Sequence, residues 1–166
     1  MQIDEEADVA GLLDRLVRAE LPDGRGSGAW VSLLRAHATL IRRLEADLQR
    51  ETGLALADFD VLAQLARAGG KLRMTELAAR ALISRSGMTR RVARLVDEGL
   101  VRRADADADG RGVVVALTGA GVARLAETAP THARGISKLF VAQLDDQELA
   151  MLEQALGKVI IDCSFG

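Results

Sequence analysis

Arginine and lysine residues are concentrated in one segment of the sequence. The whole chain carries 22 lysine and arginine residues against 24 aspartate and glutamate residues, so its formal charge is −2. Residues 67–103 alone hold ten cations and three anions, a net charge of +7, which leaves −9 on the rest of the chain. A strongly cationic segment in an acidic chain indicates a site for a polyanion, and guanidinium groups pair well with phosphates and guanine edges.

The densest part of this segment is predicted to be a helix that ends at Glu98, with Ser84 or Ser86 as its N-cap and Gly99 after its end. A period of 3.6 residues places Met88, Val92 and Leu95 on one buried side. The other faces and the capping turn hold hydroxyl and guanidinium groups, the candidate nucleic-acid contacts: Ser84, Arg85, Ser86, Thr89, Arg90, Arg91 and Arg94. Small residues at its start allow a helix to enter a major groove closely, and its N-terminus attracts phosphate.

The alternative interpretation of these arginines is an ordinary solvated surface. We disfavour it because the arginines lack the carboxylates at i+4 that would neutralise such a face. Cations without nearby acids are better explained by an external anionic partner. Duplex DNA is the partner that this argument predicts.

The flanking sequence predicts the elements that would position this helix. A long helix is expected at 29–51, a second at 57–68 and a short one at 74–82 with Thr75 as N-cap. Strands are expected at 100–103 and 113–117 around a tight loop, followed by a helix capped by Thr118 and a last one opening at Asp145. A hairpin directly after two short helices is a winged helix-turn-helix. The fold class expected is therefore mainly α, an α+β winged helix-turn-helix with six or seven helices and a small hairpin wing.

The first long helix carries an apolar seam that needs a partner. Its members are four, three, four, three and four residues apart: Trp30, Leu34, His37, Ile41, Leu44 and Leu48. This spacing is typical of a helix packed along another helix, and it predicts a homodimer. His37 has two open interpretations: a core histidine satisfied by a hydrogen bond, or a polar group of an effector pocket with Trp30 and Arg35.

The loop between the strands holds two further candidates. Arg111 lies between Gly110 and Gly112, and an arginine on a slim loop can enter the minor groove; an unremarkable surface loop is the alternative. Asp105, Asp107 and Asp109 match the first half of a calcium loop, but position 12 is Ala116 where a bidentate glutamate is required. We therefore expect no metal and a solvated acidic loop.

Other functional classes find little support in the residues. No carboxylate pair, nucleophile–base pair or metal cluster occurs at catalytic spacing, so we expect no enzyme and no cofactor. Cys163 has no cationic neighbours that would depress its pKa, which disfavours redox sensing. The acidic N-terminus lacks the pattern of a secretory signal, and the longest apolar run, 113–117, is far too short to span a bilayer. A soluble, cytoplasmic protein that binds no membrane is the expectation.

Four groups of residues together resemble the MarR family of transcriptional regulators: Leu77-Ala-Ala, Ser84 to Arg90, Gly99-Leu-Val-Arg102 with Asp109-Gly-Arg111, and Leu117-Thr-Gly-Ala-Gly121. The resemblance covers about residues 29–162. It implies a winged helix-turn-helix at 56–117, an intertwined helical dimerisation region at 29–55 and 118–166, and an N-terminal extension at 1–28. It also implies a palindromic operator and, in many members, release by a small phenolic or other anionic ligand held between the lobes.

The same resemblance assigns roles to individual residues. Ser86, Thr89, Arg90 and Arg94 match major-groove positions, and Arg111 matches the wing arginine. Asp109 matches an acidic wing residue that orients arginine side chains. The expected function is a sequence-specific regulator that binds DNA as a homodimer, most often a repressor. The alternative is a dimeric winged-helix scaffold or interaction module without operator recognition.

Overall fold

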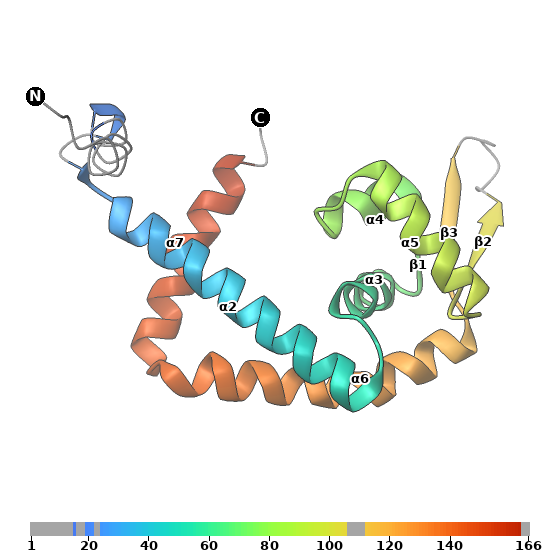
Figure 1. Cartoon of the computed structure of the whole chain (residues 1–166). Coiled ribbons are helices and arrows are strands. Elements are labelled where there is room, and N and C mark those ends of the chain that lie inside the picture. Colours follow the sequence, from blue (N-terminus) through green and yellow to red (C-terminus); the bar gives the residue numbers. More distant parts are fainter. Residues whose placement is uncertain (1–14, 16–18, 22–23, 106–111, 164–166) are drawn as a thin grey trace, which may run out of the picture. The chain divides into compact units, whose positions relative to one another are not determined.

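The computed structural model describes residues 15, 19–21, 24–105 and 112–163, and these divide into two compact units, one up to Arg42 and one from Arg43 onward. Within them lie six α-helices, a 3-10 turn and three strands (Figure 1). The helices and the turn are α2 (Ser27–Thr52), α3 (Leu56–Arg67), α4 (Met74–Arg80), α5 (Arg85–Asp97), α6 (Gly119–Leu139), η2 (Val141–Gln143) and α7 (Asp146–Cys163). The strands are β1 (Lys71–Arg73), β2 (Val101–Asp105) and β3 (Val113–Leu117). The predicted winged helix-turn-helix is confirmed.

The sheet contains one strand that the sequence pattern does not reveal. All its pairs are antiparallel and its order is β1-β3-β2, so β3 lies in the centre. Val115 of β3 is opposite Leu72 of β1 on one side and Arg103 of β2 on the other. The short β1 therefore joins the segment between α3 and α4 to the hairpin, which makes the hairpin part of the same compact unit as the helices.

The main core lies where α3, α4 and α5 meet this sheet. Met88, Val92 and Leu95, the side of α5 expected to be buried, are all 0% exposed. They pack with fully buried residues of the other elements: Val61, Leu62 and Leu65 of α3, Leu77 of α4 and Val115 of β3. Each large aliphatic side chain buried in this way contributes about 1.5–3 kcal/mol. The apolar face of α5 thus fixes which of its sides remain available to a ligand.

The ends of the elements are set by local hydrogen bonds. The backbone amide of Gly121 donates to Oγ1 of Thr118 at 3.0 Å, so Thr118 caps α6 as expected. Gly99 follows α5 with φ of 73°, a left-handed conformation that glycine adopts without strain. The expected cap of α4 is wrong: its N-cap is Arg73, and the carboxylate of Glu76 accepts a hydrogen bond from the amide of Arg73.

The last turns of α2 are attached to α6. The guanidinium of Arg134 lies 3.0 Å from the carboxylate of Glu51, and the guanidinium of Arg124 donates to the carbonyl of Thr52. Adding a Cβ at Gly135 would bring it within 2.5 Å of the side chain of Leu44, so the two helices are in close contact there. The last turns of α2 and the helix α6 therefore pack together within the unit that begins at Arg43.

Candidate nucleic-acid interface

The start of α5 is an exposed turn capped by Ser84. Ser84 is the N-cap, and its Oγ accepts a hydrogen bond from the amide of Gly87 at 3.2 Å and lies 3.4 Å from Oγ of Ser86. A side chain at position 87 would meet Ile83 and Ser84 at 3.0 Å, so glycine suits this tight first turn. Ser84, Arg85 and Ser86 are all exposed. A helix N-terminus with exposed hydroxyls favours phosphate and base-edge contacts.

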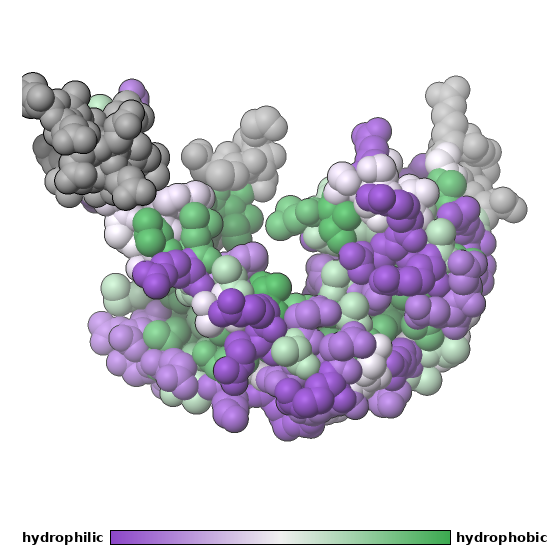
Figure 2. Space-filling model, in the orientation of Figure 1, coloured by the Kyte–Doolittle hydropathy of each residue, from purple (hydrophilic) through white to green (hydrophobic). Residues whose placement is uncertain are grey.

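The turn before α5 contains an unusual residue. Leu82 has φ of 53° and is 94% exposed, and among the described residues it is the single non-glycine residue with positive φ. Figure 2 shows hydrophobic surface at this turn, whereas the surface over α5 and β2 is mainly hydrophilic. A leucine in the left-handed region is strained by about 1–2 kcal/mol. The sequence pattern did not predict this exposed leucine in a left-handed conformation.

The outer face of α5 carries Thr89 and Arg90. Both are exposed, and the hydroxyl of Thr89 donates to the carbonyl of Arg85 at 2.9 Å, which leaves its oxygen as an acceptor. The side chain of Arg90 makes no hydrogen bond or ion pair with any part of the chain that the structure describes. Among the arginines expected to read DNA, Arg90 therefore has both the position and the freedom to do so.

Arg91 and Arg94 occupy a different environment from the one expected. Nη1 of Arg91 lies 2.7 Å from Oδ1 of Asp58, and Nη2 of Arg94 binds both oxygens of the same carboxylate. Asp58 is in the first turn of α3, and its side chain is only 5% exposed. Nε of Arg94 also lies 3.9 Å from Glu98, four residues later. The expectation that Arg94 faces outward without a neutralising acid is corrected by these contacts.

The pairing is reflected in the titration of Arg94. Hydrogen bonding to Asp58, and then its charge, raise the pKa of the Arg94 guanidinium, so the group stays cationic. The side chain of Arg94 is 52% exposed and that of Arg91 is 26% exposed. Both guanidinium groups are thus partly accessible while remaining bound to a buried acid.

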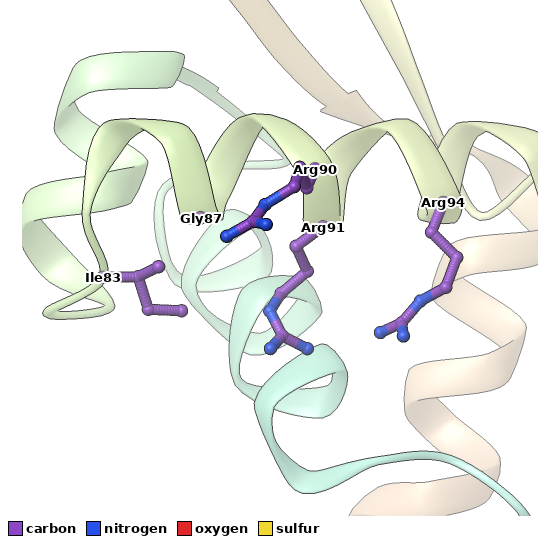
Figure 3. A pocket seen from close by; sticks show the side chains of 5 residues that line it. All are labelled: Ile83, Gly87, Arg90, Arg91 and Arg94. Carbon is purple, nitrogen blue, oxygen red and sulfur yellow. The ribbon is translucent and has the colours of Figure 1, made fainter.

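Two hollows flank α5. The first, of about 310 Å³, is lined by Ile83, Gly87, Arg90, Arg91 and Arg94 (Figure 3). Figure 3 shows Arg91 and Arg94 extending away from α5 toward α3, while Arg90 runs along α5. The first hollow is therefore lined by three guanidinium groups, of which Asp58 binds two.

The second hollow lies between α5 and β2. It has a volume of about 450 Å³ and is lined by Ala93, Val96, Asp97, Arg102 and Arg103. Arg102 and Arg103 are exposed on β2 and were not among the candidate contacts, although the charge count of the segment includes them. Phosphate backbones border the major groove of a duplex, so this second hollow, with its two exposed arginines, suits a phosphate strand.

The remaining candidates lie elsewhere or outside the described residues. Asp109 and Arg111, together with most of the acidic loop, belong to positions 106–111, which the structure does not describe. Trp30, Arg35 and His37 lie in the first unit and are exposed, Trp30 by 60%. His37 is therefore not a buried core histidine within the single chain, and neither of the two hollows is lined by these three residues.

No described helix is long and apolar enough to cross a membrane. Within the described ranges, no group of three or more histidine, cysteine or acidic residues is placed to hold a metal ion. These findings concern the described residues alone. The chemistry of the interface therefore rests on guanidinium, hydroxyl and amide groups.

Comparisons with known proteins agree with this architecture. A sequence model described as the MarR family matches residues 52–112, which include α3, β1, α4, α5 and β2. An HTH-type transcriptional regulator of Bacillus cereus is 29% identical over 134 residues, covering 81% of this chain and 88% of the relative. A MarR family regulator from Streptomyces coelicolor shares 29% identity with a TM-score of 0.79, covering 84% of this chain and 95% of the other.

A second regulator from Streptomyces coelicolor was solved in complex with DNA. It is 34% identical, with a TM-score of 0.75, and the alignment covers 81% of this chain and 88% of that one. The identity, the coverage and the winged helix-turn-helix fold all point to the same group of DNA-binding proteins. This chain belongs to the MarR family of transcriptional regulators.

Proposed function

We propose that the protein is a homodimeric repressor that binds a palindromic operator through α5 and the wing. The observation that carries the proposal is the outer face of α5, where Ser86, Thr89 and Arg90 are exposed beside a fully buried opposite face. Hydroxyl and guanidinium groups are the groups that recognise base edges in the major groove. In this proposal Ser84 and Arg85 contact the adjacent backbone, and Arg111 enters the minor groove.

Exposed apolar residues support the homodimer. On α2, Trp30, Leu34 and Ile41 are 60%, 48% and 42% exposed; on α7, Met151 and Ile160 are 62% and 65% exposed. Large apolar side chains at helical spacing are rarely left in water, so these two helices need a partner surface. A twofold dimer would set two copies of α5 about 34 Å apart, the length of one duplex turn.

The proposal includes a small effector that binds beside α2. Trp30, Arg35 and His37 supply an aromatic ring, a cation and a titratable ring, which suit a small phenolic or other anionic ligand. Their exposure in one chain is consistent with a pocket completed by the second protomer. Release of DNA in the presence of a panel of phenolic acids, with His37→Ala as the comparison, tests this assignment.

Selection of duplexes from a randomised library tests the function itself. We expect enrichment of a palindrome with half-sites about one turn apart, and a dimer by sedimentation at micromolar concentration. The affinity of a regulator with several phosphate contacts falls steeply with salt, by ~10³ or more between about 50 and 200 mM. Weak and equal binding to every duplex would instead favour the scaffold alternative.

Arg90→Ala tests the role of α5 at single-residue resolution. We expect it to cost about 1–3 kcal/mol on the selected duplex and to relax the preference at one base pair, because a guanidinium that reads a base is lost. An equal loss on unrelated DNA would reassign Arg90 to phosphate contact. Thermal unfolding of the variant should be unchanged, since Arg90 binds no other described residue.

A further inference from the structure

Asp58 is a buried acid placed directly beneath the DNA-binding helix. It is 4% exposed and lies in the first turn of α3. Its carboxylate binds guanidinium groups 33 and 36 positions later in the chain, those of Arg91 and Arg94. Burying a carboxylate is costly unless cations and hydrogen bonds compensate for the lost water, and here two cations do so.

The two contacts fix the rotation of α5 about its own axis. Arg91 and Arg94 are separated by nearly one helical turn, and both are tied to a single carboxylate. A helix held at two points one turn apart on the same side can neither roll nor slide without breaking an ion pair. Ser86, Thr89 and Arg90 are thereby kept on the exposed part of the helix.

The same contacts change how many cations are available to DNA. Of the three guanidinium groups lining the first hollow, Asp58 binds two, and Arg90 makes no ion pair with the described residues. Phosphate contacts strengthen binding to any sequence, whereas base contacts distinguish one sequence from another. Withholding two of three arginines from phosphate therefore favours discrimination over general affinity.

We propose that Asp58 is a positioning residue for sequence discrimination: it orients the reading face of α5 and withholds Arg91 and Arg94 from the phosphate backbone. The proposal rests on the proposed function, because it assumes that α5 faces DNA. It also predicts that removal of the Asp58 charge strengthens binding to random DNA, where loss of a binding residue would weaken it. Loss of the Asp58 charge frees two guanidinium groups, so binding to random DNA should increase while operator discrimination decreases.

The experiment compares Asp58→Asn with the wild type on two duplexes. One duplex is selected by the wild-type protein from a randomised library, and the other is a scrambled sequence of the same composition. On the scrambled duplex we expect Asp58→Asn to bind more tightly at low salt, with a log–log salt slope steeper by up to ~1.8 per protomer for two added contacts. We expect its preference for the selected duplex to fall at least ~10-fold.

Asp60→Asn is the matched control. Asp60 lies on the same helix and its loss changes the net charge equally, but the described ion pairs with α5 belong to Asp58. Asp60→Asn should leave the salt slope unchanged and the preference within about twofold of the wild type. Asp58→Glu keeps the charge and should restore most of the preference, whereas a purely steric role would be kept by Asn, which has the shape of Asp, and lost in the longer Glu.

One outcome would contradict the positioning role of Asp58. If Asp58→Asn weakens binding to both duplexes in the same proportion with an unchanged slope, Asp58 is only a structural brace and the proposal is overturned. If Asp58→Asn does not fold, Arg94→Gln and Arg85→Gln decide the matter on the scrambled duplex. Arg85→Gln, at a residue proposed to contact the backbone, should reduce the slope by ~0.9 per protomer, and Arg94→Gln should leave it unchanged; equal reductions overturn the proposal.

The design separates this proposal from the function on which it rests. If the wild-type protein selects no sequence, the operator-binding function fails by itself. The salt slopes of the wild type, Asp58→Asn and Asp60→Asn on the scrambled duplex still show whether Asp58 withholds the two arginines. An unchanged slope in Asp58→Asn would then overturn the Asp58 proposal as well.

Discussion

Gly121→Ala should destabilise the junction between the wing and α6. A Cβ added at Gly121 would lie 2.0 Å from the carbonyl oxygen of Leu100, 3.0 Å from its carbon and 3.2 Å from the side chain of Leu117. Ordinary C···O contacts are about 3.3 Å or longer, so the first turn of α6 would have to move by about 1.3 Å. The obstacle is backbone, which cannot turn aside as a flexible side chain would.

The cost can be worked out from the bonds that this movement breaks. Leu100 accepts hydrogen bonds from the amide and the hydroxyl of Thr118, both at 3.1 Å, and the hydroxyl of Thr118 also donates to Gly99 at 2.7 Å. Weakening two or three of them costs about 0.5–1.5 kcal/mol each. Replacing a helical glycine by alanine recovers about 1 kcal/mol. Three bonds at about 1 kcal/mol each, less the gain of about 1 kcal/mol, leave a net loss in the free energy of unfolding of about 2 kcal/mol.

Gly119→Ala is the matched control for this measurement. Gly119 is in the same first turn of α6, and a Cβ there would meet nothing within 4 Å. Urea unfolding followed by circular dichroism should show Gly119→Ala equal to the wild type or slightly more stable, because alanine favours the helix. If Gly121→Ala proved as stable as Gly119→Ala, within about 0.5 kcal/mol, the close approach of α6 to Leu100 would be refuted.

Two further substitutions test other features of the fold by chemical unfolding. Leu82→Gly should raise the free energy of unfolding by about 0.5–1 kcal/mol, because it relieves a left-handed leucine that is 94% exposed; a loss of stability would show that Leu82 makes a stabilising contact. The ring of His132 lies 4.5 Å from that of Phe59, and burial lowers its pKa, with Arg67 acting in the same direction and Asp60 opposing. The unfolded chain therefore takes up this proton first, so stability should be full above about pH 6.5 and fall as the pH decreases below it. His132→Phe should abolish that part of the pH dependence, and an unchanged pH profile would contradict this assignment.

Local patterns in the sequence predict the helices well because their causes are local. The buried side of α5 follows from the spacing of Met88, Val92 and Leu95, and the caps Ser84 and Thr118 lie at the predicted positions. The carboxylate of Asp145 likewise accepts a hydrogen bond from the amide of Glu148 at 2.8 Å, and Glu148 accepts one in return from the amide of Asp145. Reciprocal pairs of this kind need only residues three positions apart.

Features that depend on distant partners could not be predicted in the same way. Strand β1 has three residues, too few for their polar–apolar–polar alternation to indicate a strand, and it forms because β3 lies beside it. The misplaced cap of α4 has a similar origin, since the chain enters α4 directly from this strand. A short extended segment becomes a strand because of the neighbouring strand with which it pairs.

The arginines of α5 show the same division between local and distant causes. A helical projection gives the angle of Arg94 about α5, but it contains nothing about α3, whose Asp58 is 36 positions earlier. Glu98 lies four residues after Arg94, and its ion pair with Arg94 contradicts the prediction that these arginines lack an acid at i+4. For Arg90, no described residue competes, so the projection and the structure agree on its exposure.

The direct passage from β3 into α6 has a mechanical consequence. One residue, Thr118, separates the central strand from the helix, and three hydrogen bonds fasten it to Gly99 and Leu100. The connection between β3 and α6 therefore contains no free linker residues that could act as a hinge. Five residues of strand extend about 17 Å, so a 10° turn of α6 transmitted rigidly would swing the far end of β3 by roughly 3 Å. A small rotation at the start of α6 would therefore appear at the far end of β3 as a displacement of several ångströms.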